Sequence, residues 1–180
     1  MFCRDPRVIV IDTPRLTLRP HTVDDLAHVV ALARDPAVTA FIRGLPTSEE
    51  ECWHRLLRYA GHWSQLGFGM FAVFERQTGR FVGEAGLADF HRGLGADFDG
   101  APEAAWMLMG WAHGAGLALE AAAAAHAWLE ERRPGGRTVC IIDPANLGSI
   151  RLSQKLGYAP FRQGVYRDAP VTLFERRLMT

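Results

Sequence analysis

The spacing of the apolar residues changes at Gly69, and this change restricts the fold that the chain can adopt. Before Gly69, apolar residues recur at helical spacing in two segments, 22–35 and 47–67. After it, they follow a period of two over 70–75 and 81–90, on either side of a turn at Gln77-Thr78-Gly79-Arg80. Two helices followed by a β-hairpin predict a mixed α/β fold.

Both helical segments carry start signals of their own. Thr22 followed by Asp25 places a capping residue and an acid in the first turn of one helix. The second helix is expected to open at Thr47 or Ser48, with glutamates 49–51 at the positive end of its dipole, and to close near Gly67. The core faces that we expect are Leu26, Val29, Val30 and Ala33 in the first helix and Trp53, Leu56, Leu57 and Ala60 in the second.

The remaining segments complete the predicted order of elements. Leu16 to Arg19 is typical of a short first strand. After the hairpin we expect an exposed loop bordering a site at 91–102, a strand at 103–109, an alanine-rich helix at 114–131, a strand at 137–142, a helix at 147–156 and two strands within 158–178. The order β-α-α-β-β-β-α-β-α-β-β predicts a mainly antiparallel sheet flanked by helices, with a late parallel crossover. The length of 180 residues favours one domain, 1–180.

The composition excludes several classes of function. Twenty acidic residues balance twenty basic ones, so we expect no nucleic acid and no membrane surface as a partner. Charged residues interrupt the segment from Met1 to Pro20, which argues against a signal peptide and favours a cytoplasmic protein. Three unpaired cysteines and seven scattered histidines indicate neither a disulfide framework nor a metal site.

A glycine turn between a strand and a helix is the first motif with chemical meaning. Gly114 and Gly116 lie where the segment from Met107 to Ala121 passes into the helix, and successive N–H groups at a helix start can cradle a phosphate or pyrophosphate. A dinucleotide motif would need a third glycine at the position of Leu119, so that interpretation is disfavoured.

A second motif lies some thirty residues further on, from Asp143 to Tyr158, and reads Asp-Pro-Ala-Asn-Leu-Gly-Ser-Ile-Arg-Leu-Ser-Gln-Lys-Leu-Gly-Tyr. Together with the turn at 114–116 and the opening segment from Thr13 to Pro20, it resembles the GNAT superfamily of N-acetyltransferases. The likeness is greatest to the branch of ribosomal-protein-alanine N-acetyltransferases. It extends over nearly the whole chain, although Trp111 stands where that family commonly has Gln or Arg.

The resemblance implies how acetyl-coenzyme A is held, as a co-substrate without a metal. The pyrophosphate would meet the turn, and the pantetheine arm would lie between strands 103–109 and 137–142 like an added strand. A strand N–H would polarise the thioester carbonyl. The residues implied are His113, Gly114, Ala115, Gly116 and Ala118 at the turn, Leu108 or Met109 as the N–H donor, Asn146 against the arm and Ser149 near the sulfur.

An amine with a pKa near 10 is mostly protonated at pH 7, so it must lose a proton before or during its attack. Glu84 and Glu103 are the two acids on neighbouring central strands, and either is a candidate to accept that proton or to bind the amine. His91, His113 and His126 are weaker candidates, and Tyr158 is expected to pack rather than to act as an acid.

The sequence therefore predicts transfer of an acetyl group from acetyl-coenzyme A to an amine by direct attack. The sequence leaves open whether the acceptor is a protein N-terminus or a small-molecule amine. It also leaves open whether the protein forms a homodimer. Two rivals are a non-catalytic sensor or interaction module that binds acyl-coenzyme A and a nucleotide-binding α/β protein that uses the turn for another phosphate.

Overall fold

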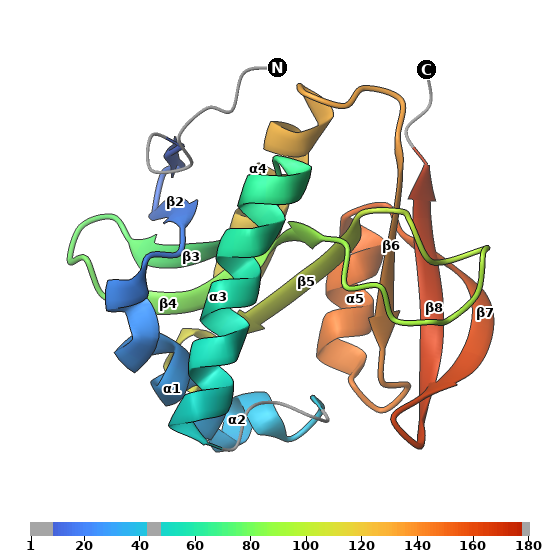
Figure 1. The fold of residues 1–180 in the computed structure, drawn as a ribbon, viewed down its shortest axis with the longest axis horizontal. Coiled ribbons are helices and arrows are strands. Elements are labelled where there is room, and N and C mark those ends of the chain that lie inside the picture. The colour runs from blue at the N-terminus through green and yellow to red at the C-terminus, as the bar shows by residue number, and fades with distance from the viewer. Residues whose placement is uncertain (1–8, 43–47, 178–180) are drawn as a thin grey trace.

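The structure is a computed structural model that describes residues 9–42 and 48–177. The expectations for 1–8, for a helix start at Thr47 and for a strand end at Leu178 lie outside these ranges. One mixed sheet of eight strands in the order β1-β2-β3-β4-β5-β6-β8-β7 carries helices on both faces (Figure 1). The predicted fold class is confirmed. Within the described ranges, none of the helices has the length and apolarity to cross a lipid bilayer.

The elements follow the predicted order with a few additions, among them β1 and α2. The strands are β1 (Ile11–Asp12), β2 (Leu16–Pro20), β3 (Met70–Glu75), β4 (Phe81–Ala88), β5 (Glu103–Leu108), β6 (Arg137–Ile142), β7 (Ala159–Tyr166) and β8 (Ala169–Arg177). The α-helices are α1 (Leu26–Arg34), α2 (Pro36–Thr39), α3 (Glu49–Leu66), α4 (Leu117–Glu130) and α5 (Leu147–Lys155), and the 3-10 helices are η2 (Val23–Asp25) and η3 (Gly110–Ala112). The predicted strand 81–90 ends earlier, at Ala88, and the predicted helix 114–131 begins later, at Leu117.

Alternate side chains on the central strands pack against different helices, because successive residues of a strand point to opposite faces. Phe71 and Val73 of β3 join Ala121 and Leu129 of α4 in one core cluster. Ala72, between them, packs instead with side chains of α1 and α2. Cys52 and Leu56 of α3 pack against α1, while Trp63 near the end of α3 joins the cluster that contains α4. The sheet is therefore covered by α1, α2 and most of α3 on one face and by α4 on the other (Figure 1).

Helix α3 is capped as predicted but turned differently about its axis. Ser48 and Glu51 form a reciprocal capping box, and Gly67 ends the helix with a φ of 74°. Of the four residues predicted for its core face, only Leu56 is buried; Trp53 and Leu57 are 37% and 46% exposed. The buried residues of α3 are Cys52, Arg55, Leu56, Tyr59 and Trp63. The prediction was wrong because an arginine and a tyrosine belong to the buried face.

The first helix is as predicted, since Val29 and Ala33 are buried and Leu26 and Val30 pack beside them. The segment 91–102 is irregular, also as predicted, but it is not wholly exposed. Its Phe98 is 2% exposed and joins a core cluster of β6 and β8.

The sheet opens between β5 and β6. These parallel strands pair at one position, Glu103 with Val139, where the Val139 N–H donates to the Pro102 carbonyl at 3.0 Å. By contrast, β4 and β5 stay in register from Gly83–Leu108 to Ala88–Glu103. Beyond the pair at Glu103 the two strands separate toward their C-terminal ends. A gap in the sheet therefore lies directly before the glycine turn that leads into α4.

Asp35, at the junction of α1 and α2, fixes the start of η3 beside this gap. Its Oδ2 accepts the Gly110 N–H at 2.7 Å, while its Oδ1 caps α2 by accepting the Ala37 N–H. The two segments touch so closely that a Cβ on Gly110 would lie 2.9 Å from the Cβ of Ala37. A glycine is needed here for close approach.

Gly110→Ala is expected to lower the free energy of unfolding by about 1–3 kcal/mol, because the added methyl overfills this contact. Gly61→Ala is the matched control, since a Cβ at Gly61 of α3 meets no atom within 4 Å. Removing this helical glycine should raise stability by about 0.5–1 kcal/mol. Urea unfolding of both variants measures the difference, and equal effects would contradict the close approach.

Candidate active site

A cavity of about 760 Å³ lies at the gap between β5 and β6. Strands β5 and β6 form its walls, α3 and the residues just after α2 lie on one side, and the turn between β7 and β8 closes another. Polar and aromatic residues of its lining include Glu51, His54, Arg55, Arg58, Tyr59, Phe90, Arg92, Glu103, Trp106, Asp143, Asn146, Ser149, Tyr166 and Arg167. Of the predicted site residues, Glu103, Asn146 and Ser149 belong to this lining.

The N–H groups of β5 divide between its two neighbours. The Met109 N–H donates to the Val82 carbonyl at 2.9 Å, so it is engaged in the sheet. Because donors alternate along an antiparallel pair, the N–H groups of Trp106 and Leu108 point away from β4, toward the gap. Met109 is therefore wrong as the free strand donor, and Leu108 has the required orientation.

The glycine turn has the backbone that the sequence suggested. Gly114 and Gly116 take φ values of 77° and 76°, and a Cβ on Gly114 would meet no atom within 4 Å. Within the described ranges, the N–H groups of Gly114, Ala115 and Gly116 donate no hydrogen bond. The first amides of α4 follow directly, where an α-helix leaves its N–H groups unpaired. The turn is open and rich in donors, as an anion site requires.

His113 differs from the other residues of the turn. Its N–H donates to the Gly110 carbonyl at 3.2 Å, and its Nε2 lies 2.8 Å from the Leu108 carbonyl, to which it donates. The backbone N–H of His113 is therefore already engaged within the protein, unlike those of Gly114, Ala115 and Gly116. None of 113–118 lines the cavity itself; the turn lies beyond the end of β5, five residues after Leu108.

Arg15, directly before β2, anchors the turn. Its Nη1 donates to the Ala115 carbonyl at 2.8 Å and its Nε to Glu120 Oε2 at 2.6 Å. Thr13 also donates to Glu120, so that α4 is tied to the start of β2. The Arg15 side chain is half exposed and is paired with Glu120, so the charge of its guanidinium beside the turn is partly offset.

Asn146 and Ser149 lie where α5 begins at the edge of the cavity. Asn146 Oδ1 accepts the Ser149 N–H at 3.0 Å and so caps the helix. Ser149 Oγ accepts the indole N–H of Trp106 at 3.2 Å. That contact uses Oγ as an acceptor, so the hydroxyl hydrogen of Ser149 can still be donated.

Glu103 and Arg92 form a nearly buried ion pair in the cavity wall. Arg92 Nε contacts both carboxylate oxygens, at 2.8 and 2.6 Å, and the guanidinium lies between the rings of Phe90 and Tyr166. Burial raises the pKa of the Glu103 carboxyl, and Arg92 offsets only part of this effect. Glu103 is thus a carboxylate with raised proton affinity at the gap.

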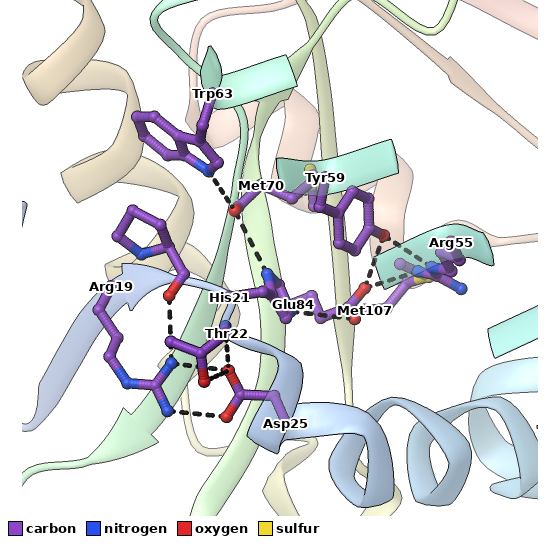
Figure 2. Close-up of polar contacts among 11 residues, drawn as sticks. Arg19, His21, Thr22, Asp25, Arg55, Tyr59, Trp63, Met70, Glu84 and Met107 are labelled. Carbon is purple, nitrogen blue, oxygen red and sulfur yellow. Dashed lines mark hydrogen bonds and ion pairs between the residues drawn. The ribbon is translucent and has the colours of Figure 1, made fainter. Parts of the chain in front are cut away.

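Glu84 lies in a different environment, shown in Figure 2. It is fully buried and does not line the cavity. Oε2 accepts from Arg55 Nη2 at 2.6 Å and from the Tyr59 hydroxyl at 2.9 Å. Burial alone would raise the pKa of Glu84, but Arg55, His21 and Tyr59 outweigh it and lower the pKa to about 2. A carboxylate so enclosed and so weakly basic is unsuited to accept a substrate proton, which removes Glu84 from the candidates.

His21 completes this buried cluster. Its Nδ1 lies 3.4 Å from the Met70 carbonyl, which can only accept, and its Nε2 lies 3.3 Å from Glu84 Oε1 (Figure 2). The orientation at Nε2 is too poor for a hydrogen bond. Trp63 Nε1 donates to the same Met70 carbonyl, which holds α3 against β3.

Tyr158 packs as predicted. It is 3% exposed, and its hydroxyl lies 2.7 Å from His126 Nε2 and 2.8 Å from Thr138 Oγ1. Burial raises the pKa of Tyr158 and lowers that of His126. His91, the remaining histidine candidate, lies in the segment 91–102 with a φ of 48° and is not part of the cavity lining.

Sequence reasoning missed Arg15, Arg55, Arg92 and Trp106. For Arg55 a signal existed, because it lies three residues after Cys52 and four before Tyr59, on the buried face of α3. A charged residue within an apolar stripe marks a buried polar network. Arg92 carried no such signal, since it lies in an irregular segment and meets Glu103 only through the tertiary fold.

The comparisons with known proteins agree with this arrangement. Residues 15–159 match the family model described as Acetyltransferase (GNAT) domain. The chain therefore belongs to the GNAT acetyltransferase family, which confirms the resemblance drawn from the two motifs and supports its assignment as an acyltransferase.

Individual relatives extend over nearly the whole chain. A protein from Bordetella pertussis assigned to the GnaT-family acetyltransferases is 32% identical, with a TM-score of 0.85 over 93% of this chain and 99% of its own. The uncharacterized protein YkkB of Bacillus subtilis is 26% identical over 171 residues, 92% of this chain and 94% of its own. The ribosomal L7/L12 alpha-N-protein acetyltransferase RimL, solved with coenzyme A, shares the fold at 14% identity, with a TM-score of 0.75 over 94% of this chain and 98% of its own.

Glu84→Gln is expected to lower the free energy of unfolding at pH 7 by about 3–5 kcal/mol, because Arg55 keeps its charge in a buried site without a partner. The pKa of Glu84 is lowered in the folded protein. Its stabilisation is therefore complete above the ordinary carboxyl pKa of about 4.3 and is lost as the pH falls toward the folded value of about 2.

Urea unfolding across this pH range measures both effects. Glu175→Gln, which removes the partly exposed partner of Arg137, should cost at most about 1 kcal/mol. An acid dependence between these two pKa values that is the same in parent and Glu84→Gln would contradict the role given to Glu84.

Proposed function

We propose that this protein transfers the acetyl group of acetyl-coenzyme A to an amine. The observation that carries the proposal is the gap between β5 and β6. It presents a Leu108 N–H and ends at a turn of amides that have no acceptor among the residues that the structure describes. Family membership supports acetyl transfer in general. That the acceptor is an amine is our proposal.

The backbone of the turn supports its assignment as the site of the coenzyme phosphates. Gly114, Ala115 and Gly116 offer free N–H groups, the space above Gly114 is open, and Ala118 lies in the first turn of α4. Arg15, which is paired with Glu120, holds the turn in place through the Ala115 carbonyl. The arm would then lie along the free edge of β5, close to Asn146.

The acetyl group supplies a thioester carbonyl, and the remaining steps belong to the protein. The Leu108 N–H polarises the carbonyl oxygen as the amine nitrogen attacks the carbonyl carbon. A C–N bond forms and the C–S bond breaks. The amine proton passes to Glu103 through water molecules in the gap, because the length of β5 separates Glu103 from Leu108. The Ser149 hydroxyl hydrogen stabilises the departing thiolate.

A non-catalytic coenzyme-binding module is the alternative to this enzyme. It would bind acetyl-coenzyme A at the same turn but release no thiol when amines are added. The raised pKa of Glu103, at the gap itself, favours the enzyme, because a binding module has no need of a basic carboxylate there.

Gly114→Val is expected to weaken acetyl-coenzyme A binding at least tenfold, because the side chain would fill the space where the phosphate oxygens approach the amides. Calorimetric titration gives the dissociation constant of parent and variant. In the parent, the coenzyme should also raise the melting temperature by mass action.

Gly67→Val is the matched control for backbone strain. Gly67 has a φ of 74° and an equally open surrounding, but it ends α3, away from the turn. Both variants should lose similar stability, and only Gly114→Val should lose affinity. Equal affinity in the two variants would show that the turn does not bind the coenzyme.

Glu103→Gln is expected to lower the acetylation rate by roughly 100-fold or more while leaving coenzyme affinity nearly unchanged. Because burial raises the Glu103 pKa, the parent rate should fall with decreasing pH above the range of an ordinary carboxyl group, and the variant should lose this limb. Thiol release from acetyl-coenzyme A, followed against a panel of amines, provides the rates.

Glu130→Gln serves as the control, because Glu130 pairs with Arg176 outside the cavity lining. It should keep the parent rate and pH profile. If Glu103→Gln also keeps them, Glu103 is not the base; if the parent binds acetyl-coenzyme A yet releases no thiol with any amine, the binding module is correct.

A further inference from the structure

Arg55 is held rigidly in the wall of the cavity. Its Nε donates to the Tyr59 hydroxyl at 2.7 Å, and its Nη2 donates to Glu84 Oε2 at 2.6 Å and contacts Met107 Sδ at 3.3 Å (Figure 2). The side chain is only 7% exposed. These contacts leave the guanidinium a single orientation.

One nitrogen of this guanidinium is not used by the protein. Within the described ranges Nη1 of Arg55 donates to no atom, although Arg55 lines the cavity. Its two hydrogens are therefore the part of Arg55 left for a molecule in the cavity. A nearly buried donor with a fixed direction and no acceptor is an incomplete hydrogen-bonding site.

Arg58 lies one turn further along the same face of α3 and lines the same cavity. Its guanidinium lies 6.0 Å from the centre of the Phe90 ring, and no carboxylate among the described residues forms an ion pair with it. The cavity thus presents donors from two neighbouring arginines.

The acids around these arginines are engaged elsewhere. Glu84 is bound to Arg55 from behind, Glu103 is bound to Arg92, and Asp143 accepts the Ala145 N–H. Glu51 caps α3 through the Ser48 N–H. A ligand that completes Arg55 and Arg58 must bring acceptor oxygens of its own, and a ligand with only ammonium groups brings none.

We propose that the acceptor is an amine that also carries a carboxylate, which Arg55 Nη1 and Arg58 bind while the amine faces the gap. This inference rests on the proposed acetyl transfer and narrows its acceptor. Two sources supply such a group: the α-carboxylate of a free amino acid and an acidic side chain at a peptide N-terminus. Cationic polyamines lack the required acceptor oxygens.

The test compares acceptors that differ in charge at saturating acetyl-coenzyme A. The comparison of L-alanine with L-alaninamide tests a free amino acid as the acceptor. The comparison of Asp-Ala-Ala amide with Lys-Ala-Ala amide tests a peptide, and 1,4-diaminobutane represents the polyamines. We expect kcat/KM to be roughly tenfold to a hundredfold higher for the carboxylate member of at least one pair, after correction for the fraction of neutral amine.

Arg58→Gln should reduce this preference without affecting folding. Its matched control is Arg133→Gln, because Arg133 is also an exposed arginine over a phenylalanine, Phe68, but does not line the cavity. Arg55→Met is made together with Glu84→Leu, so that no buried charge is left unpaired. The double variant should abolish the preference, and its affinity for acetyl-coenzyme A reports whether it folds.

Absence of a carboxylate preference in both pairs would overturn the proposal, and so would a preference that survives Arg58→Gln and the double variant. Failure of the proposed function looks different, because no acceptor is then acetylated at all. Calorimetric titration of L-alanine and Asp-Ala-Ala amide into protein saturated with coenzyme A tests the arginine site without activity. Equal binding by parent and Arg58→Gln there would also overturn the proposal.

Discussion

The separation of β5 from β6 after their single pairing at Glu103 and Val139 is the constraint on which the site depends. A continuous sheet would pair the N–H groups of Trp106 and Leu108 and leave no space between the two layers of helices. Because the strands separate, one edge of β5 keeps unpaired donors inside the fold. A buried N–H group needs an acceptor, and a ligand that enters the gap can supply one.

The gap also lies between two faces of the sheet that pack against different helices. Leu108 packs with α4, whose N-terminus carries the glycine turn, whereas Met107 packs on the side of α1 and α2. The glycine turn therefore lies on one face and the arginines of α3 lie on the other. Asp35 links the two faces, since it caps α2 and holds the Gly110 N–H at the start of η3.

Glu84 and Glu103 show how surroundings separate two identical side chains. Both are nearly inaccessible and both contact an arginine. Arg55, Tyr59 and His21 contact Glu84 and lower its pKa to about 2 despite burial. Arg92 contacts Glu103, whose pKa burial keeps raised. The contacts of Glu84 hold Arg55 rigidly, whereas Glu103 remains a carboxylate with raised proton affinity at the cavity. Their roles diverge because the number of compensating partners differs.

The sequence by itself determined the elements, because periodicity, capping residues and glycines act over a few neighbouring positions. It predicted the hairpin after Gly69, the capped helix before it and the open turn at Gly114. It did not determine which face of α3 is buried, which glutamate reaches the cavity, or that the Met109 N–H is engaged by Val82. Those features depend on contacts between residues far apart in the chain, such as Arg55 with Glu84, and only the tertiary structure decides them. Local patterns specify hydrogen bonds within an element, whereas burial and strand pairing are set by what packs against it.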